Sequence, residues 1–156
     1  MDVDGVLTDG RINLNELGQE IKSFDVHDGF GMVLLRRAGY KTAIISARAS
    51  AAVKARAKDL LIDKIYQDAY PKIAAYEALK KTLQVSDEQV CYVGDDLPDL
   101  PVLRQAGFAV AVSNAVQEVR LAADYVTKAH GGRGAVREVV ELILKTQGRW
   151  DALLTA

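Results

Sequence analysis

Short apolar runs alternate with helix-forming segments along this chain, and no other feature constrains its fold as strongly. The runs that predict strands cover residues 40–45, 62–66, 90–93, 108–112 and 125–126. The segments that predict helices cover residues 28–37, 50–58, 71–83, 100–105, 116–122 and 135–147. Strands that alternate with helices are typical of an α/β fold, so we expect a single, doubly wound, mainly parallel sheet with helices on both faces.

Length and composition limit the classes of function. The chain has 156 residues, a formal net charge of -1 and 26% charged residues, and it shows no internal repeat or linker. We therefore expect one domain over residues 1–156, with a small ligand and with neither nucleic acid nor a membrane as partner. The single Cys91 excludes an intrachain disulfide, and no apolar run has the length of a membrane helix or signal peptide, so we expect a cytoplasmic protein.

Two carboxylates stand at the start of the chain, where Asp2 and Asp4 are followed by Gly5. Side chains two apart on an extended strand point to the same side, so this pair can share a cation or divide the roles of nucleophile and acid. These residues alone are equally consistent with an ordinary turn, because Asp and Gly are common in turns.

Further polar residues follow other predicted strands. Ser46 follows the strand at 40–45, an acidic cluster at 94–99 follows the strand at 90–93, and Lys72 stands at a helix start. In parallel α/β sheets, ligands bind outside the carboxyl ends of the strands. We therefore expect these groups to meet the first motif at one edge of the sheet.

These motifs, in this order, resemble those of the haloacid dehalogenase superfamily of phosphatases. Within it, residues 2–10, 27–31, 94–96 and 130–135 are similar to the motifs of the capless 3-deoxy-D-manno-octulosonate 8-phosphate phosphatases, over essentially the whole chain. The resemblance implies a Rossmann-like fold without a cap domain. It also implies Mg²⁺-dependent hydrolysis of that keto-acid sugar phosphate, a step of lipopolysaccharide biosynthesis, through an aspartyl-phosphate.

The resemblance also implies roles for individual residues. Asp2 would attack phosphorus, and Asp4 would protonate the leaving sugar oxygen and then activate water. Mg²⁺ would be bound by the carboxylates of Asp2 and Asp95, the backbone carbonyl of Asp4 and waters. Ser46 and Lys72 would contact the phosphate. Family members carry a full strand before the first motif, yet only Met1 precedes Asp2, so this strand is expected to be clipped or its start misassigned, which puts this version's stability and activity in question.

Four more residues are expected to support the site or to contact the substrate: Asp96, Thr8, Arg48 and Asp99. Arg48 could meet the sugar carboxylate, whereas Asp99 is equally consistent with a cap of the following turn. Residues 130–134 are assigned to the rim of the site by the resemblance. By themselves they could also be a flexible loop or a backbone anion nest.

Residues 11–25 show the alternation of a β-hairpin, with Ile12, Leu14, Ile21 and Phe24 as its apolar residues. An isolated two-stranded ribbon is marginal in water, so this hairpin should pack against something. The resemblance implies that such hairpins meet at the centre of a homotetramer and close a site that has no inserted lid, with a neighbour's carboxyl-terminal tail near the pocket. A hairpin folded back on its own domain is the alternative.

Three other functions remain open. A phospho-accepting receiver domain also uses carboxylates, a hydroxyl, a lysine and Mg²⁺, but there the phospho-accepting Asp precedes the hydroxyl and the lysine. Here the second acidic cluster follows both Ser46 and Lys72, which favours the phosphatase. A phosphatase of nine-carbon keto-acid sugars fits the same motifs, and a catalytically inactive scaffold would follow if the shortened start misplaces Asp2.

Overall fold

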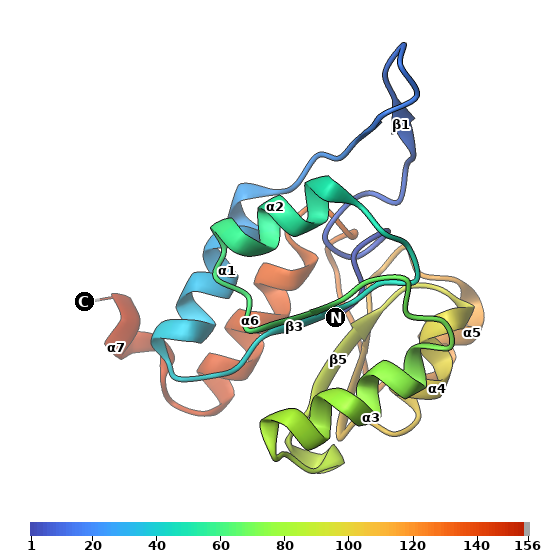
Figure 1. The fold of residues 1–156 in the computed structure, drawn as a ribbon. Helices are drawn as coiled ribbons and strands as arrows, with labels where there is room; N and C mark the ends of the chain where they lie inside the picture. The colour runs from blue at the N-terminus through green and yellow to red at the C-terminus, as the bar shows by residue number, and fades with distance from the viewer. Residues whose placement is uncertain (155–156) are drawn as a thin grey trace.

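The computed structural model describes residues 1–154 and confirms the expected α/β fold. Its parallel strands are β3 (Ala43–Ile45) with β4 (Lys64–Tyr66), and β5 (Cys91–Gly94), β6 (Phe108–Ala111) and β7 (Tyr125–Val126) in that order. The main helices are α1 (Val26–Arg37), α2 (Ala51–Asp59), α3 (Lys72–Leu83), α4 (Leu100–Leu103), α5 (Gln117–Ala122) and α6 (Ala135–Thr146). Figure 1 shows α1, α2 and α6 on one side of the strands and α3, α4 and α5 on the other.

The first two residues lie between the two parallel sheets and join them. The carbonyl of Met1 accepts a hydrogen bond from the N–H of Ile45 in β3 at 3.0 Å, and the N–H of Asp2 donates to the carbonyl of Val93 in β5 at 3.0 Å. Met1 and Asp2 therefore occupy the central position of the strand layer, between β3 and β5. Asp2 consequently stands where β3 and β5 both end.

Helix α6 shows how the sequence pattern builds the core. Val136, Val139, Val140 and Leu144 recur at spacings of three and four, and all are buried. This spacing places them on one face of the helix. That side of the strand layer also holds α1, whose Met32 is buried, and the two helices pack against each other.

The start of α1 differs from the predicted helix over residues 28–37, because the helix begins at Val26. The N-cap is Asp25, whose carboxylate accepts hydrogen bonds from the N–H groups of His27 at 2.6 Å and Asp28 at 3.3 Å. Asp28 is buried in the first turn and accepts from the N–H groups of Gly134 at 3.2 Å and Arg137 at 2.8 Å. It therefore caps α6, because its carboxylate meets the unpaired N–H groups and the positive end of that helix.

Other elements differ in length or were not expected. The strand predicted at 40–45 is limited to β3, and 3-10 turns occur at η1 (Asp87–Gln89) and η2 (Leu97–Asp99). A short helix, α7 (Trp150–Leu154), ends the described region, and Trp150 packs against the core. None of the helices within residues 1–154 is long and apolar enough to cross a membrane.

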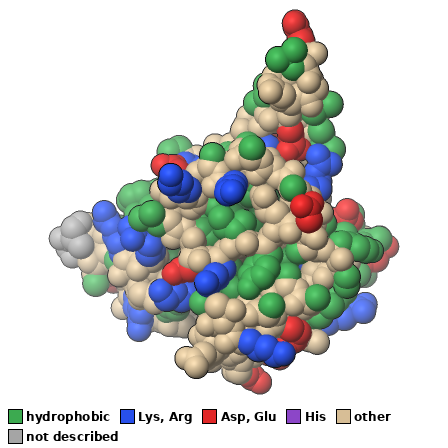
Figure 2. All heavy atoms as spheres, viewed as in Figure 1, with side chains coloured by type: hydrophobic (Ala, Val, Ile, Leu, Met, Phe, Trp, Pro, Cys, Tyr) green, Lys and Arg blue, Asp and Glu red, His purple; other side chains and the backbone are tan. Residues whose placement is uncertain are grey.

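The hairpin projects from the domain rather than folding back on it. Its strands β1 (Asn13–Leu14) and β2 (Glu20–Ile21) pair antiparallel, and Figure 1 shows them extending away from the strand layer. Four large apolar side chains of this segment are exposed: Ile12, Leu14, Leu17 and Ile21. Figure 2 shows hydrophobic side chains gathered on this projection. The alternative in which these side chains pack on their own domain is therefore wrong for this structure.

We predict that Asp28→Ala lowers the free energy of unfolding by about 1–3 kcal/mol, because the N–H groups of Gly134 and Arg137 lose their acceptor. Urea unfolding measures the change. The control is Asp59→Ala, which removes an exposed pair with Arg56 and should change stability by less than about 0.5 kcal/mol. Equal effects of the two substitutions would show that Asp28 does not join α1 to α6.

Candidate active site

A cavity of about 200 Å³ opens where β3 and β5 end. Its lining comes from the first motif, the loops after β3 and β5, and the start of α3: Asp2, Asp4, Gly10, Ser46, Ala47, Arg48, Lys72, Asp95 and Asp96. The structure thus brings together the residues that the sequence singled out for catalysis and metal binding. Thr8 and Asp99 are not among the lining residues.

Lys72 is buried between two carboxylates. Its Nζ lies 2.8 Å from Oδ1 of Asp2 and 2.7 Å from Oδ1 of Asp99, and its side chain is 3% exposed. Burial lowers the pKa of Lys72, but the two carboxylates outweigh this and raise it above the ordinary value. Lys72 therefore stays charged, and it fixes one oxygen of Asp2 at the wall of the cavity.

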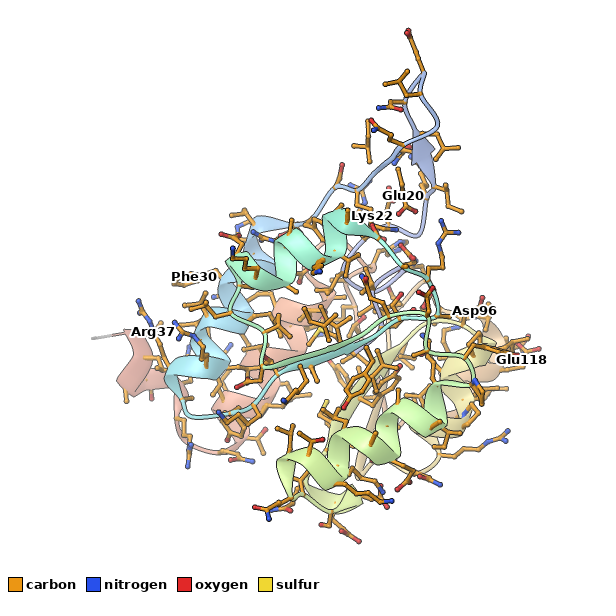
Figure 3. The ribbon with its side chains drawn as sticks, in the orientation of Figure 1. Glu20, Lys22, Phe30, Arg37, Asp96 and Glu118 are labelled. Atoms are coloured by element: carbon orange, nitrogen blue, oxygen red, sulfur yellow. The ribbon has the colours of Figure 1, made fainter. Side chains whose placement is uncertain are left out.

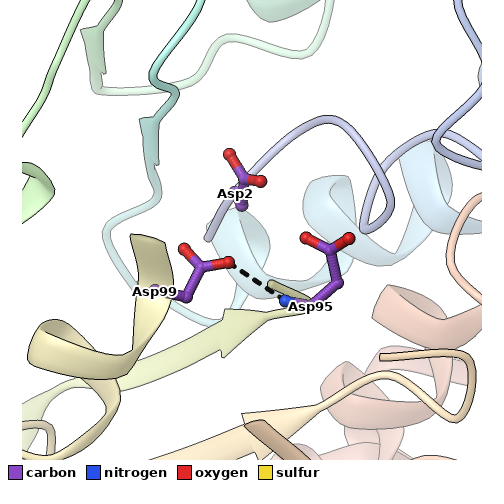
Figure 4. A group of neighbouring side chains, drawn as sticks. All are labelled: Asp2, Asp95 and Asp99. Carbon is purple, nitrogen blue, oxygen red and sulfur yellow. Dashed lines mark hydrogen bonds between the residues drawn. The ribbon is translucent and has the colours of Figure 1, made fainter. Parts of the chain in front are cut away.

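Asp99 anchors this arrangement from behind the cavity. Its Oδ1 also accepts from the hydroxyl of Tyr92 at 2.7 Å, and its Oδ2 accepts from the N–H groups of Asp95 at 3.0 Å and Asp96 at 3.3 Å. Figure 4 shows the bond from Asp99 to Asp95. Asp99 thus caps the turn after β5, as one interpretation had it, and also holds Lys72.

Three carboxylates form a compact acidic group. Asp2, Asp95 and Asp99 each offer one oxygen, and these oxygens lie within 4.8 Å of one another (Figure 4). Burial raises the pKa of Asp95 to about 8, with Asp2 and Asp99 adding to the effect. Oδ1 of Asp95 is buried and has no hydrogen-bond partner within the described residues.

This donor set fits a hard divalent cation. Both oxygens of Asp99 already accept hydrogen bonds, so Asp2 and the unpartnered oxygen of Asp95 are the carboxylate donors left for an ion. Mg²⁺ prefers oxygen ligands and keeps several waters, and one or two carboxylates from the protein suffice. A cation here would also offset the repulsion between the two carboxylates.

Glycines let the loops of the site approach each other closely. Gly5 has φ +88°, and a Cβ at this position would lie 1.9 Å from Oδ2 of Asp95. A Cβ on Gly131 would lie 1.6 Å from the carbonyl oxygen of Gly5. Gly131 therefore packs against the first motif, and residues 130–134 are not among the residues that line the cavity. The rim position that the resemblance implied stays a prediction.

The loop after β3 contributes Ser46 and Arg48. Ser46 is 2% exposed, and its hydroxyl accepts a hydrogen bond from the N–H of Arg48 at 3.3 Å. The guanidinium of Arg48 is about half exposed at the cavity, with Nη2 2.8 Å from Oε1 of Glu20 and Nε 3.7 Å from Oδ2 of Asp4. A hydroxyl and a cation thus face the cavity from one loop.

Thr8 and Asp96 differ in their positions. Thr8 is buried, and its hydroxyl accepts from the N–H groups of Gly5 at 3.3 Å and Gly10 at 3.2 Å, so it shapes the loop rather than meeting a ligand. Asp96 lines the cavity, and its carboxylate accepts from the N–H of Leu97 at 2.8 Å.

Sequence reasoning missed Lys22, whose ammonium forms an ion pair with Asp4. Alternation along residues 20–22 places Glu20 and Lys22 on one face of the ribbon, which was a usable signal. Nothing in the sequence shows that this face turns toward the first motif.

Comparisons with known proteins agree with this geometry. A family model described as haloacid dehalogenase-like hydrolase matches residues 42–139. The chain is 46% identical over 150 residues to the 3-deoxy-D-manno-octulosonate 8-phosphate phosphatase of Yersinia pestis, which covers 96% of this chain and 80% of that protein. The chain belongs to the haloacid dehalogenase-like hydrolases.

Solved structures place this hydrolase within that family in more detail. A Moraxella catarrhalis 3-deoxy-D-manno-octulosonate 8-phosphate phosphatase, in complex with magnesium, phosphate and KDO, matches with a TM-score of 0.97 and 47% identity, over 99% of this chain and 89% of that one. A cobalt-bound Haemophilus influenzae phosphatase matches with a TM-score of 0.91 and 41% identity, over 94% and 86%. The resemblance read from the motifs is therefore confirmed, and the family match favours a hydrolase over a receiver domain.

We predict that Gly5→Ala destabilises this hydrolase more than Gly39→Ala does. Both glycines have positive φ, +88° and +84°, but only Gly5 has Asp95 where the methyl group would lie, since no atom of residues 1–154 comes within 4 Å of the methyl position at Gly39. Gly39→Ala should lower the free energy of unfolding by about 1–2 kcal/mol, because it adds only backbone strain. Gly5→Ala should lower it by at least about 1 kcal/mol more. Urea unfolding of both variants measures the difference, and equal costs would contradict the close packing of Gly5 on Asp95.

Proposed function

We propose that this chain is a magnesium-dependent phosphatase that hydrolyses 3-deoxy-D-manno-octulosonate 8-phosphate to the free sugar acid and phosphate. The observation that carries the proposal is the carboxylate of Asp2, held by buried Lys72 at the wall of the cavity and beside Asp95. The names of the Yersinia and Moraxella relatives support the substrate. A phosphatase of nine-carbon keto-acid sugar phosphates is the alternative that the same motifs allow.

The proposed reaction has two steps. In the first, an oxygen of Asp2 forms a bond to phosphorus, the bond from phosphorus to the sugar oxygen breaks, and Asp4 gives its proton to that oxygen. In the second, a water oxygen bonds to phosphorus, the aspartyl-phosphate bond breaks, and Asp4 takes a proton from the water. Asp2 and Asp4 both line the cavity, as both steps require.

The other residues position and stabilise the phosphoryl group. Lys72 orients Asp2 and offsets the negative charge of the phosphate, while the hydroxyl of Ser46 donates to a phosphoryl oxygen. The carboxylates of Asp2 and Asp95 and the backbone carbonyl of Asp4 would hold Mg²⁺. When bound, that ion supplies positive charge against the carboxylates and the phosphate.

Substrate recognition is assigned to the mouth of the cavity. Arg48 has a half-exposed guanidinium there and would bind the sugar carboxylate, and Asp96 would accept hydrogen bonds from a bound water. Thr8 would act by holding its loop in place, and Asp99 by holding both the loop after β5 and the ammonium of Lys72.

The oligomer is proposed to be a homotetramer in which hairpins 11–25 of the subunits pack together. Support comes from four large apolar side chains of the hairpin that its own domain leaves exposed: Ile12, Leu14, Leu17 and Ile21. We further propose that residues 1–156 form one phosphatase domain, with the hairpin as its assembly segment. The cytoplasmic location stays a prediction.

We predict that Asp2→Asn abolishes phosphate release from sugar phosphates and from a generic aryl phosphate, because an amide cannot attack phosphorus. Retention of more than a few per cent of the activity, with a normal circular dichroism spectrum, would exclude the covalent role. Asp9→Asn is the control, since Asp9 belongs to the same motif but is exposed and outside the cavity, and it should stay active. Phosphate release by the unsubstituted enzyme is then compared between eight-carbon and nine-carbon sugar phosphates, and the faster reaction identifies the substrate.

We predict that Ile21→Asp dissociates the tetramer, because a charged group would replace an apolar contact between hairpins. Light scattering at assay concentration measures the mass. Leu121→Asp is the matched control: it alters an exposed apolar residue on α5, far from the hairpin in sequence, and should leave the assembly intact. An active, monomeric unsubstituted protein would rule out assembly through the hairpin.

A further inference from the structure

Four charged side chains form a closed ring between the hairpin and the cavity. The ammonium of Lys22 pairs with the carboxylate of Asp4, and its Nζ lies 3.1 Å from Oε1 of Glu20. The guanidinium of Arg48 contacts the carboxylates of both Glu20 and Asp4. Figure 3 shows Glu20 and Lys22 close together at the base of the hairpin. The ring thus joins three separate segments of the chain.

Burial distinguishes the two cations of the ring. The side chain of Lys22 is 1% exposed, whereas that of Arg48 is 48% exposed. A lysine so far from water is costly unless carboxylates stay beside it, and Lys22 has two. Its ammonium is therefore fixed in place, unlike the mobile end of an ordinary surface lysine.

We propose that Lys22 is a positioning residue for the hydrolysis, which holds the carboxylate of Asp4 and stabilises the charge that forms on it. This inference rests on the proposed function, in which Asp4 is the acid. As Asp4 passes its proton to the leaving sugar oxygen, a full negative charge forms on its carboxylate. A cation already in contact with that group stabilises this charge without having to reorganise.

Glu20 extends this role to the second cation. Its Oε1 contacts both Lys22 and Nη2 of Arg48, so one carboxylate keeps both cations turned toward Asp4. Both Glu20 and Lys22 belong to hairpin segment 11–25. The hairpin therefore contributes to the site of its own subunit, in addition to any role in assembly.

The test compares leaving groups in Lys22→Met. The sugar phosphate has a poor leaving group that needs a proton, whereas p-nitrophenyl phosphate does not. We expect kcat to fall at least about tenfold on the sugar phosphate and less than about threefold on the aryl phosphate. Lys80→Met is the matched control, since Lys80 also lies between two carboxylates, Asp87 and Glu77, but away from the cavity. It should change neither rate.

A double variant separates positioning from a general structural effect. Because Lys22 acts through Asp4, adding Lys22→Met to Asp4→Asn should cause no further loss on the sugar phosphate. The inference would be overturned if Lys22→Met lowered kcat equally on both substrates. It would also be overturned if the loss in the double variant were the product of the two single losses. Lys22→Gln repeats the comparison should Lys22→Met fail to fold, since it keeps a polar group without the charge.

Two controls distinguish this inference from the proposed function. If the unsubstituted enzyme releases no phosphate, or if Asp4→Asn shows no dependence on the leaving group, the proposed function itself fails. If both behave as expected and Lys22→Met matches Lys80→Met, only the role of Lys22 fails. Light scattering of each variant shows whether the oligomer has changed.

Discussion

The site depends on one buried interaction, the ammonium of Lys72 between Asp2 and Asp99. Each of these ions would lose several kcal/mol of hydration without a partner, so the three groups stabilise one another only as a set. Asp99 completes the set through Tyr92 and the backbone of the loop after β5. The position of Asp2 is therefore tied to strand ends and loops far from it in sequence.

Close backbone packing supports that set from the other side. Gly131 lies against the carbonyl of Gly5, and Gly5 lies against Asp95, so the loops of three motifs are stacked. The ion pair between Lys22 and Asp4 adds a fourth segment, the hairpin. A site assembled from so many short loops needs no inserted lid to orient its carboxylates.

The sequence was sufficient for those parts of the structure that follow from local pattern. Alternating strands and helices predicted the α/β fold, and positions just after strands predicted that Asp2, Ser46 and Asp95 would meet. The sequence could not predict contacts that depend on the orientation of segments far apart in the chain. Asp28 caps α6 across more than a hundred residues, and the orientation of the hairpin alone decides that Lys22 meets Asp4.

In the proposed reaction, Asp2 carries the phosphoryl group during turnover. Rapid quenching of the enzyme with substrate and Mg²⁺, followed by borohydride reduction and peptide mass analysis, tests it directly, since borohydride reduces an acyl phosphate but not a free carboxylate. We predict reduction at Asp2 that depends on substrate, and no reduction at Asp4 or Asp95. Reduction at another residue, or none in an enzyme that is turning over, would contradict it.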